Sequence, residues 1–128
     1  MTEVSSQEFI NKLNEVQELM LKEEYKKAII ILDKLKAIDK QSDFNYNLTH
    51  KLYQLDSNVH SLYNQQLILK FIFSLSNKKK EISYEELLDL LKKEESLEID
   101  IGTLKREIEI LVLRSLLTCK VEETKLVL

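Results

Sequence analysis

The feature that most constrains this chain is its lack of backbone punctuation, because 128 residues contain no proline and a single glycine, Gly102. Sheet-rich folds use both residue types in their turns, so their near absence favours long helices joined by short polar connections. An apolar fraction of 44% is sufficient for a packed core and argues against wholesale disorder. The length fits one domain, or two small subdomains that share a core.

Hydropathy and cysteine content limit where such a chain is expected to work. The densest apolar stretch, residues 67–75, is too short to span a bilayer and contains Lys70, so it predicts a buried core helix and no membrane association. The first residues, MTEVSSQEF, lack the basic and apolar regions of a signal peptide. One cysteine, Cys119, cannot form an internal disulfide, which is typical of a reducing compartment. We therefore expect a soluble protein of the cytoplasm, the nucleus or both.

Residues 1–64 are predicted to form helical hairpins. Ser5 followed by Glu8 matches a capping box, and apolar residues then recur at helical spacing up to a break at residues 22–24. The next segment, EEYKKAIIILDKL, resembles the second half of a tetratricopeptide unit, although one hairpin makes no repeat array. Ser42 or Asp43 is expected to cap a third helix, and Asp56-Ser57 is expected to start a fourth.

Residues 65–128 are predicted to form a winged-helix module. A short strand at Ile82 precedes a capping box of Ser83 and Glu86, and a leucine-rich helix follows. The charged segment Lys92–Gly102 reads as a mobile loop before a last helix over residues 103–116. Alternating apolar residues from Leu117 onward then indicate a half-buried hairpin. A helix-turn-helix followed by a hairpin can dock on DNA, RNA or protein. The overall expectation is a mainly α fold, with a bundle of about four helices before the winged helix.

The charges of this module argue against nucleic acid as its partner. The second helix of the motif carries Lys105, Arg106 and Arg114, but also Glu107 and Glu109, and the net charge of the chain is −3. Phosphate binding needs a basic face, which this count does not provide. Lys78-Lys79-Lys80 reads as a solvated loop.

The sequence also lacks a recognisable catalytic, cofactor or metal site. His50 and His60 lie ten residues apart without a second cysteine or a carboxylate cluster beside them, and a metal site needs three or four converging ligands. Cys119 reads as a small core residue, and one glycine cannot build a phosphate-binding loop. We therefore expect neither an enzyme nor a cofactor.

Two surfaces remain as candidates for binding. The last residues, Lys125–Leu128, end without a tail and predict a sheet edge that is open to strand addition. Tyr84 is either an exposed aromatic anchor or a plug between helices, with core packing favoured.

The segments QLILKFIFSLSNKKKEISYEELLDLL, EIEILVLRSLL and CKVEETKLVL, together with the preceding hairpins, resemble the PCI domain. This domain occurs in the proteasome regulatory-particle lid, the COP signalosome and translation initiation factor 3. Family members carry a longer helical array, and they often have glycines where this chain has Ser115 and Cys119. The loop between Leu91 and Thr103 also looks longer than in the family.

The resemblance implies a non-catalytic scaffold subunit that docks through its winged helix into a multi-subunit PCI complex, with a non-ATPase subunit of the proteasome lid as the most similar type. It places the protein contact on the start of the module and on the wing: Ile82, Tyr84, Lys120, Val121, Lys125, Leu126, Val127 and Leu128. Two alternatives stay open: a winged-helix nucleic-acid binder, and a small helical adaptor with a peptide groove near Tyr25 and Tyr46.

Overall fold

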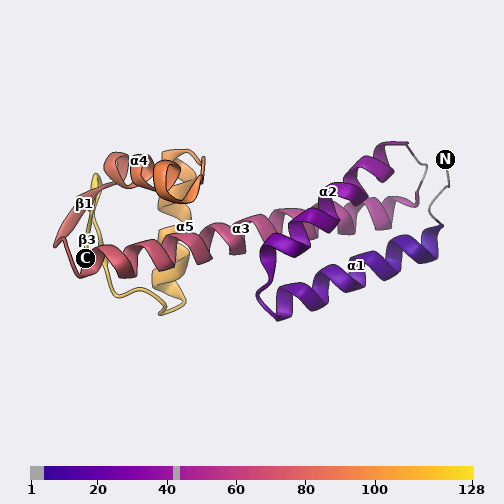
Figure 1. Ribbon diagram of the computed structural model, residues 1–128, viewed down its shortest axis with the longest axis horizontal. Coiled ribbons are helices and arrows are strands. Elements are labelled where there is room, and N and C mark those ends of the chain that lie inside the picture. Colours follow the sequence, from indigo (N-terminus) through magenta and orange to yellow (C-terminus); the bar gives the residue numbers. More distant parts are fainter. Residues whose placement is uncertain (1–4, 42–43) are drawn as a thin grey trace. The chain divides into compact units, whose positions relative to one another are not determined.

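The computed structural model describes residues 5–41 and 44–128, and that part of the chain is mainly helical with one small sheet (Figure 1). The expected fold class, a helical bundle with a short β-hairpin, is confirmed. The chain divides into two compact units, Met1–Tyr63 and Asn64–Leu128.

The first unit contains helices α1 (Ser6–Leu21), α2 (Tyr25–Gln41) and the first part of α3 (Tyr46–Ser76). The predicted cap of α1 is confirmed, because the Ser5 side chain accepts a hydrogen bond from the Glu8 amide. The break between α1 and α2 is also confirmed, and Glu23 takes the left-handed conformation there. Ala28 is fully buried at a position where a small side chain allows close helix packing. The core consists of Phe9, Leu13, Val16, Tyr25, Ala28, Leu32, Leu35, Leu52, Leu55 and Val59.

The prediction of separate third and fourth helices is wrong, because α3 is one helix of 31 residues. Asp56 lies inside it, where its carboxylate accepts a hydrogen bond from Lys36 Nζ of α2 at 3.2 Å. The side chain that was expected to cap a new helix is therefore used in a contact between helices. The cap of α3 is instead Asn45, whose side chain accepts from the Asn47 amide at 2.8 Å. Ser42 and Asp43 lie outside the described residues.

The second unit contains the remainder of α3, strand β1 (Glu81–Ser83), helices α4 (Tyr84–Glu95) and α5 (Ile101–Leu113), and strands β2 (Lys120–Val121) and β3 (Lys125–Val127). Ser83 caps α4 as predicted, accepting from the Glu86 amide at 3.1 Å. The core consists of Ile68, Ile72, Leu75, Ile82, Tyr84, Leu87, Leu91, Leu97, Leu104, Ile108, Leu111, Leu117 and Leu126.

The charged loop expected over Lys92–Gly102 is shorter than predicted. Helix α4 continues to Glu95 and α5 already begins at Ile101, so only residues 96–100 connect them. Leu97 is buried in the core, and Asp100 caps α5 by accepting from the Thr103 amide at 2.6 Å. Residues 92–95 and 101–102 of the expected loop are therefore helical.

The three strands form one antiparallel sheet with the order β1-β3-β2. Leu126 of β3 pairs with Ile82 on one side and with Val121 on the other. The expectation that the last strand is an open sheet edge is therefore wrong. The hairpin turns back so that its second strand lies between the first strand and β1, and this placement satisfies the hydrogen-bonding groups on both sides of β3.

One acidic side chain of α5 is buried inside the second unit. Glu107 is fully enclosed and accepts a hydrogen bond from Gln65 Nε2 at 3.3 Å. Gln65 Oε1 in turn accepts from Arg114 Nη1 at 2.8 Å. A buried charge needs such polar partners, because burial removes its hydration. Glu107 therefore does not belong to the surface charge of α5, although the sequence count included it.

Candidate protein-interaction surface

Three of the residues proposed for protein contact belong to the core of the second unit. Ile82 is 2% exposed, and Tyr84 and Leu126 are fully buried. Strand residues alternate between the two faces of a sheet, and Ile82 and Leu126 pair on the face that packs on the helices. Their side chains cannot reach a partner without unfolding this unit. The expectation that they form an interaction surface is wrong for this reason.

Tyr84 is a buried plug and not an exposed anchor. Its hydroxyl donates to the Glu122 carbonyl at 3.0 Å, and its amide donates to the Thr124 carbonyl at 3.2 Å. Lys105 Nζ lies 5.1 Å from the ring centroid. Burial raises the pKa of the Tyr84 phenol, and the carboxylates of Glu109 and Glu122 raise it further. Tyr84 thus connects the start of α4 to the turn of the hairpin.

The remaining proposed residues are less buried, although Val121 and Leu128 still pack against the core of the second unit. Lys120 is exposed, and Val121, Val127 and Leu128 are half-buried. Lys125 Nζ is held by Glu81 at 2.9 Å and lies 3.8 Å from Glu122. These contacts raise the pKa of Lys125, mainly through the hydrogen bond to Glu81. Lys125 therefore joins β3 to β1 across the outer face of the sheet.

The free edges of the sheet are β1 and β2. The Leu128 amide donates to the Lys80 carbonyl at 2.8 Å and the Tyr84 amide donates to Thr124, so Lys80, Ile82 and Tyr84 bond toward β3. By the alternation of antiparallel pairs, Glu81 and Ser83 direct their backbone amides away from the sheet. This edge is only three residues long. The sequence predicted a short strand at Ile82 but not that this strand is an edge, because strand order depends on which segments pair in the fold.

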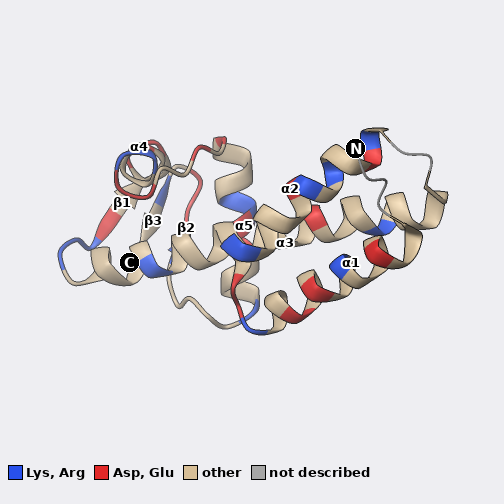
Figure 2. Cartoon of the chain, turned by 45° about the vertical axis from the view of Figure 1, so that its right-hand side comes forward, with Lys and Arg blue, Asp and Glu red and all other residues tan. Residues whose placement is uncertain are grey.

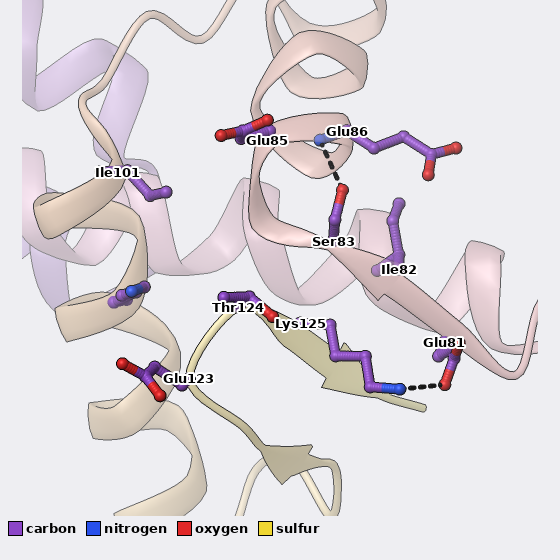
Figure 3. Close-up of a pocket in the computed structure, with 10 residues that line it drawn as sticks. Glu81, Ile82, Ser83, Glu85, Glu86, Ile101, Glu123, Thr124 and Lys125 are labelled. Atoms are coloured by element: carbon purple, nitrogen blue, oxygen red, sulfur yellow. Dashed lines mark hydrogen bonds and ion pairs between the residues drawn. The ribbon is translucent and has the colours of Figure 1, made fainter.

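A hollow of about 420 Å³ adjoins the tip of the hairpin (Figure 3). Its walls come from β1, the first turns of α4 and α5, and the turn between β2 and β3. The lining carries four carboxylates and two ammonium groups, and Ile101 is its exposed apolar residue. The lining residues are Glu81, Ile82, Ser83, Glu85, Glu86, Ile101, Lys105, Glu123, Thr124 and Lys125. Several of these charged groups already form ion pairs within the chain, because Lys125 pairs with Glu81 and Lys79 pairs with Glu86.

The surface charge of the second unit is balanced. Eleven lysine and arginine residues stand against twelve aspartate and glutamate residues in 64–128. Figure 2 shows both signs interspersed over the helices and strands. With Glu107 buried, α5 still presents Glu109 beside Lys105 and Arg106. Such a surface lacks the basic stripe that phosphate binding requires.

The cap of α5 makes a testable contribution to acid stability. The hydrogen bond from the Thr103 amide lowers the pKa of Asp100, so the folded state favours the charged carboxylate. A carboxyl group whose pKa is lower in the folded state than in the unfolded state stabilises the fold at pH values above its unfolded-state pKa. This contribution is lost as the pH falls through its folded-state pKa. We expect Asp100→Asn, which keeps a capping oxygen, to melt within about 2 °C of the wild type at pH 7. Below about pH 4 the wild type should lose more of its melting temperature than the variant. Equal losses in circular dichroism melts at both pH values would contradict this role.

Within residues 5–41 and 44–128, no cluster of three or more His, Cys, Asp or Glu side chains could hold a metal ion, and no helix is long and apolar enough to cross a membrane. His60 Nε2 lies 3.3 Å from Asp56, and His50 stacks on Tyr46 with 5.9 Å between ring centroids. Burial raises the pKa of the Cys119 thiol, which is the opposite of what activates a cysteine nucleophile.

Of the two residues near which the adaptor alternative places a groove, Tyr25 is buried in the core of the first unit and Tyr46 is exposed. A hollow of about 360 Å³ lies between α1 and α2 and is lined by Glu8, Asn11, Lys12, Ile31, Lys34, Leu35 and Ile38.

No model of a protein family, no curated protein and no solved structure matches this chain.

Proposed function

We propose that residues 64–128 are a winged-helix module and that the chain is a non-catalytic scaffold subunit that docks through this module into a multi-subunit PCI complex. The proteasome regulatory-particle lid is the first candidate for that complex. The observation that carries the proposal is the element order of the second unit. A helix, a strand, two helices and a hairpin form a sheet with the order β1-β3-β2.

Two further features support protein over nucleic acid as the partner. The surface charge of the second unit is balanced, so it offers no basic stripe for phosphate. The β1 edge directs the Glu81 amide outward, where the backbone of another chain could pair with it. The docking contact therefore shifts from the buried side chains of Ile82, Tyr84 and Leu126 to the backbone edges of the sheet and the exposed residues beside them.

The β1 edge can be blocked without removing a bond to β3. Glu81→Pro deletes an outward amide, whereas Glu81→Ala keeps the amide and equally removes the ion pair with Lys125. In affinity capture from native extract, we expect wild type and Glu81→Ala to retain subunits of the lid, the signalosome or the initiation factor. Glu81→Pro should retain at least about fivefold less, as expected when strand addition is lost.

A capture experiment that recovers none of these subunits would contradict the PCI assignment. Titration with duplex DNA at two salt concentrations tests the nucleic-acid alternative, because phosphate contacts give a steep fall in affinity with salt. We expect no such binding. A steep salt dependence at micromolar affinity would contradict the protein-docking proposal and favour a nucleic-acid binder.

A further inference from the structure

The solvent face of α5 carries a narrow stripe of four exposed residues. Gly102, Arg106, Glu109 and Leu113 follow one another at spacings of four, three and four, and all four are exposed. At about 100° per residue they fall within about 60° of the helix circumference. The opposite face holds the buried residues Leu104, Glu107, Ile108 and Leu111.

The two ends of this stripe are unusual for an exposed helix. Gly102 is the only glycine of the chain, yet it has no positive φ, and an added Cβ would meet only the Asp100 side chain at 3.4 Å. The fold therefore does not require glycine here, although glycine weakens a helix relative to alanine. Leu113, at the other end, is 83% exposed. The stripe thus has a residue without a side chain at one end and a large apolar side chain at the other.

The middle of the stripe carries opposite charges. The Arg106 side chain is 65% exposed, and its Nε lies 3.4 Å from the buried Glu107, which leaves the rest of the guanidinium toward solvent. Glu109 is exposed and has no ion-pair partner among the described residues. The order along the helix is therefore small, positive, negative, large.

This order is complementary to itself when it is reversed. In an antiparallel pair of identical helices, Arg106 of one copy faces Glu109 of the other, and Leu113 faces Gly102. Both pairs are centred between residues 107 and 108, so one two-fold axis produces all four contacts. We propose that α5 packs antiparallel against α5 of a second copy of this chain, with two Arg106–Glu109 ion pairs and two leucines seated over glycines. In a two-fold dimer, residue i of one copy contacts residue j of the other, and residue j of the first copy contacts residue i of the second. The Arg106–Glu109 and Leu113–Gly102 pairs follow this pattern.

The small area of the stripe implies a weak dimer. A stable interface buries about 800 Å² on each partner, and a helix of 13 residues, about 20 Å long, offers less. The dimer should therefore form and dissociate with concentration. Glu109 and Leu113 in the stripe also make phosphate a poor occupant of this face. This dimer does not depend on the proposed docking function, because that function uses the sheet edges.

Sedimentation equilibrium of the full chain tests the dimer. The average mass should rise from 15.1 kDa toward twice that value over about 10 µM to 1 mM protein. Arg106→Glu or Glu109→Arg places like charges opposite each other across the axis and should weaken association at least about tenfold. The double exchange restores opposite charges and should return the dissociation constant to within about threefold of wild type.

The matched control is the exchange Lys93→Glu with Glu94→Arg on the exposed face of α4, whose single variants should not change association. Because Arg106 contacts Glu107, thermal melts check that each variant is folded, and Glu109→Arg gives the same test without touching that contact. A wild type that stays at 15.1 kDa at about 1 mM would overturn the proposal. Association that the single reversals leave unchanged, or that the double exchange fails to restore, would overturn it equally.

Discussion

Replacing Tyr84 with alanine is expected to lower the free energy of unfolding by about 3–5 kcal/mol, the usual loss when a large buried aromatic is truncated. The ring is fully buried, and its hydroxyl donates to the Glu122 carbonyl at 3.0 Å. Truncation would leave a cavity next to the start of α4 and an unpaired carbonyl in the hairpin. Chemical denaturation followed by circular dichroism measures the loss.

Tyr84→Phe is the matched control, because it keeps the ring and removes only the hydroxyl. It should cost about 1–2 kcal/mol, since the Glu122 carbonyl loses one hydrogen bond. An alanine variant that unfolds at the wild-type denaturant concentration but fails to capture partner proteins would contradict the core role. That result would return Tyr84 to the surface anchor that its place in the sequence also allowed.

Deleting residues 125–128 is expected to abolish the sheet and to destabilise the second unit by at least about 3 kcal/mol. Leu126 is fully buried, and truncating such a leucine alone costs about 2–5 kcal/mol. The deletion also removes the strand that pairs with both β1 and β2. An open edge strand could be lost with a much smaller effect, so the deletion separates a central strand from an edge.

Hydrogen exchange locates the damage. The Ile82 amide, which bonds toward Leu126, and the Glu122 amide, which donates to the Lys125 carbonyl at 3.0 Å, should lose protection together in the deletion variant. Lys125→Ala is the control, because it removes the ion pair with Glu81 but keeps the strand, and an exposed ion pair contributes about 0–1 kcal/mol. Unchanged protection of Ile82 after the deletion would contradict the central position of β3.

These two expectations define which residues remain available for binding. If Tyr84 and the last strand hold the second unit together, their side chains are already committed to its core. Partner contacts must then use what the fold leaves exposed: the backbone edge at Glu81, the hollow at the tip of the hairpin, and the solvent face of α5. The sheet edge and the α5 stripe are separate surfaces, so docking and self-association can be tested by different variants.

The helices of this protein are largely determined by local sequence. Ser5 and Ser83 cap α1 and α4 as predicted, because capping depends on residues within one helical turn. The apolar periodicity after Ser5 likewise indicated α1, since side chains three and four residues apart share one side of a helix. The absence of proline and the single glycine correctly indicated a mainly helical chain.

Other features were decided only by contacts between distant segments. Asp56 looked like a cap, but Lys36 of α2 engages its carboxylate and α3 continues through it. The last strand looked like an edge, but its position depends on β1, which lies more than 40 residues earlier in the chain. Glu107 looked like a surface charge, but the fold buries it and Gln65 of α3 donates a hydrogen bond to its carboxylate. Local sequence determines capping and periodicity, whereas strand order and the burial of a polar group depend on partners that only the folded chain brings together.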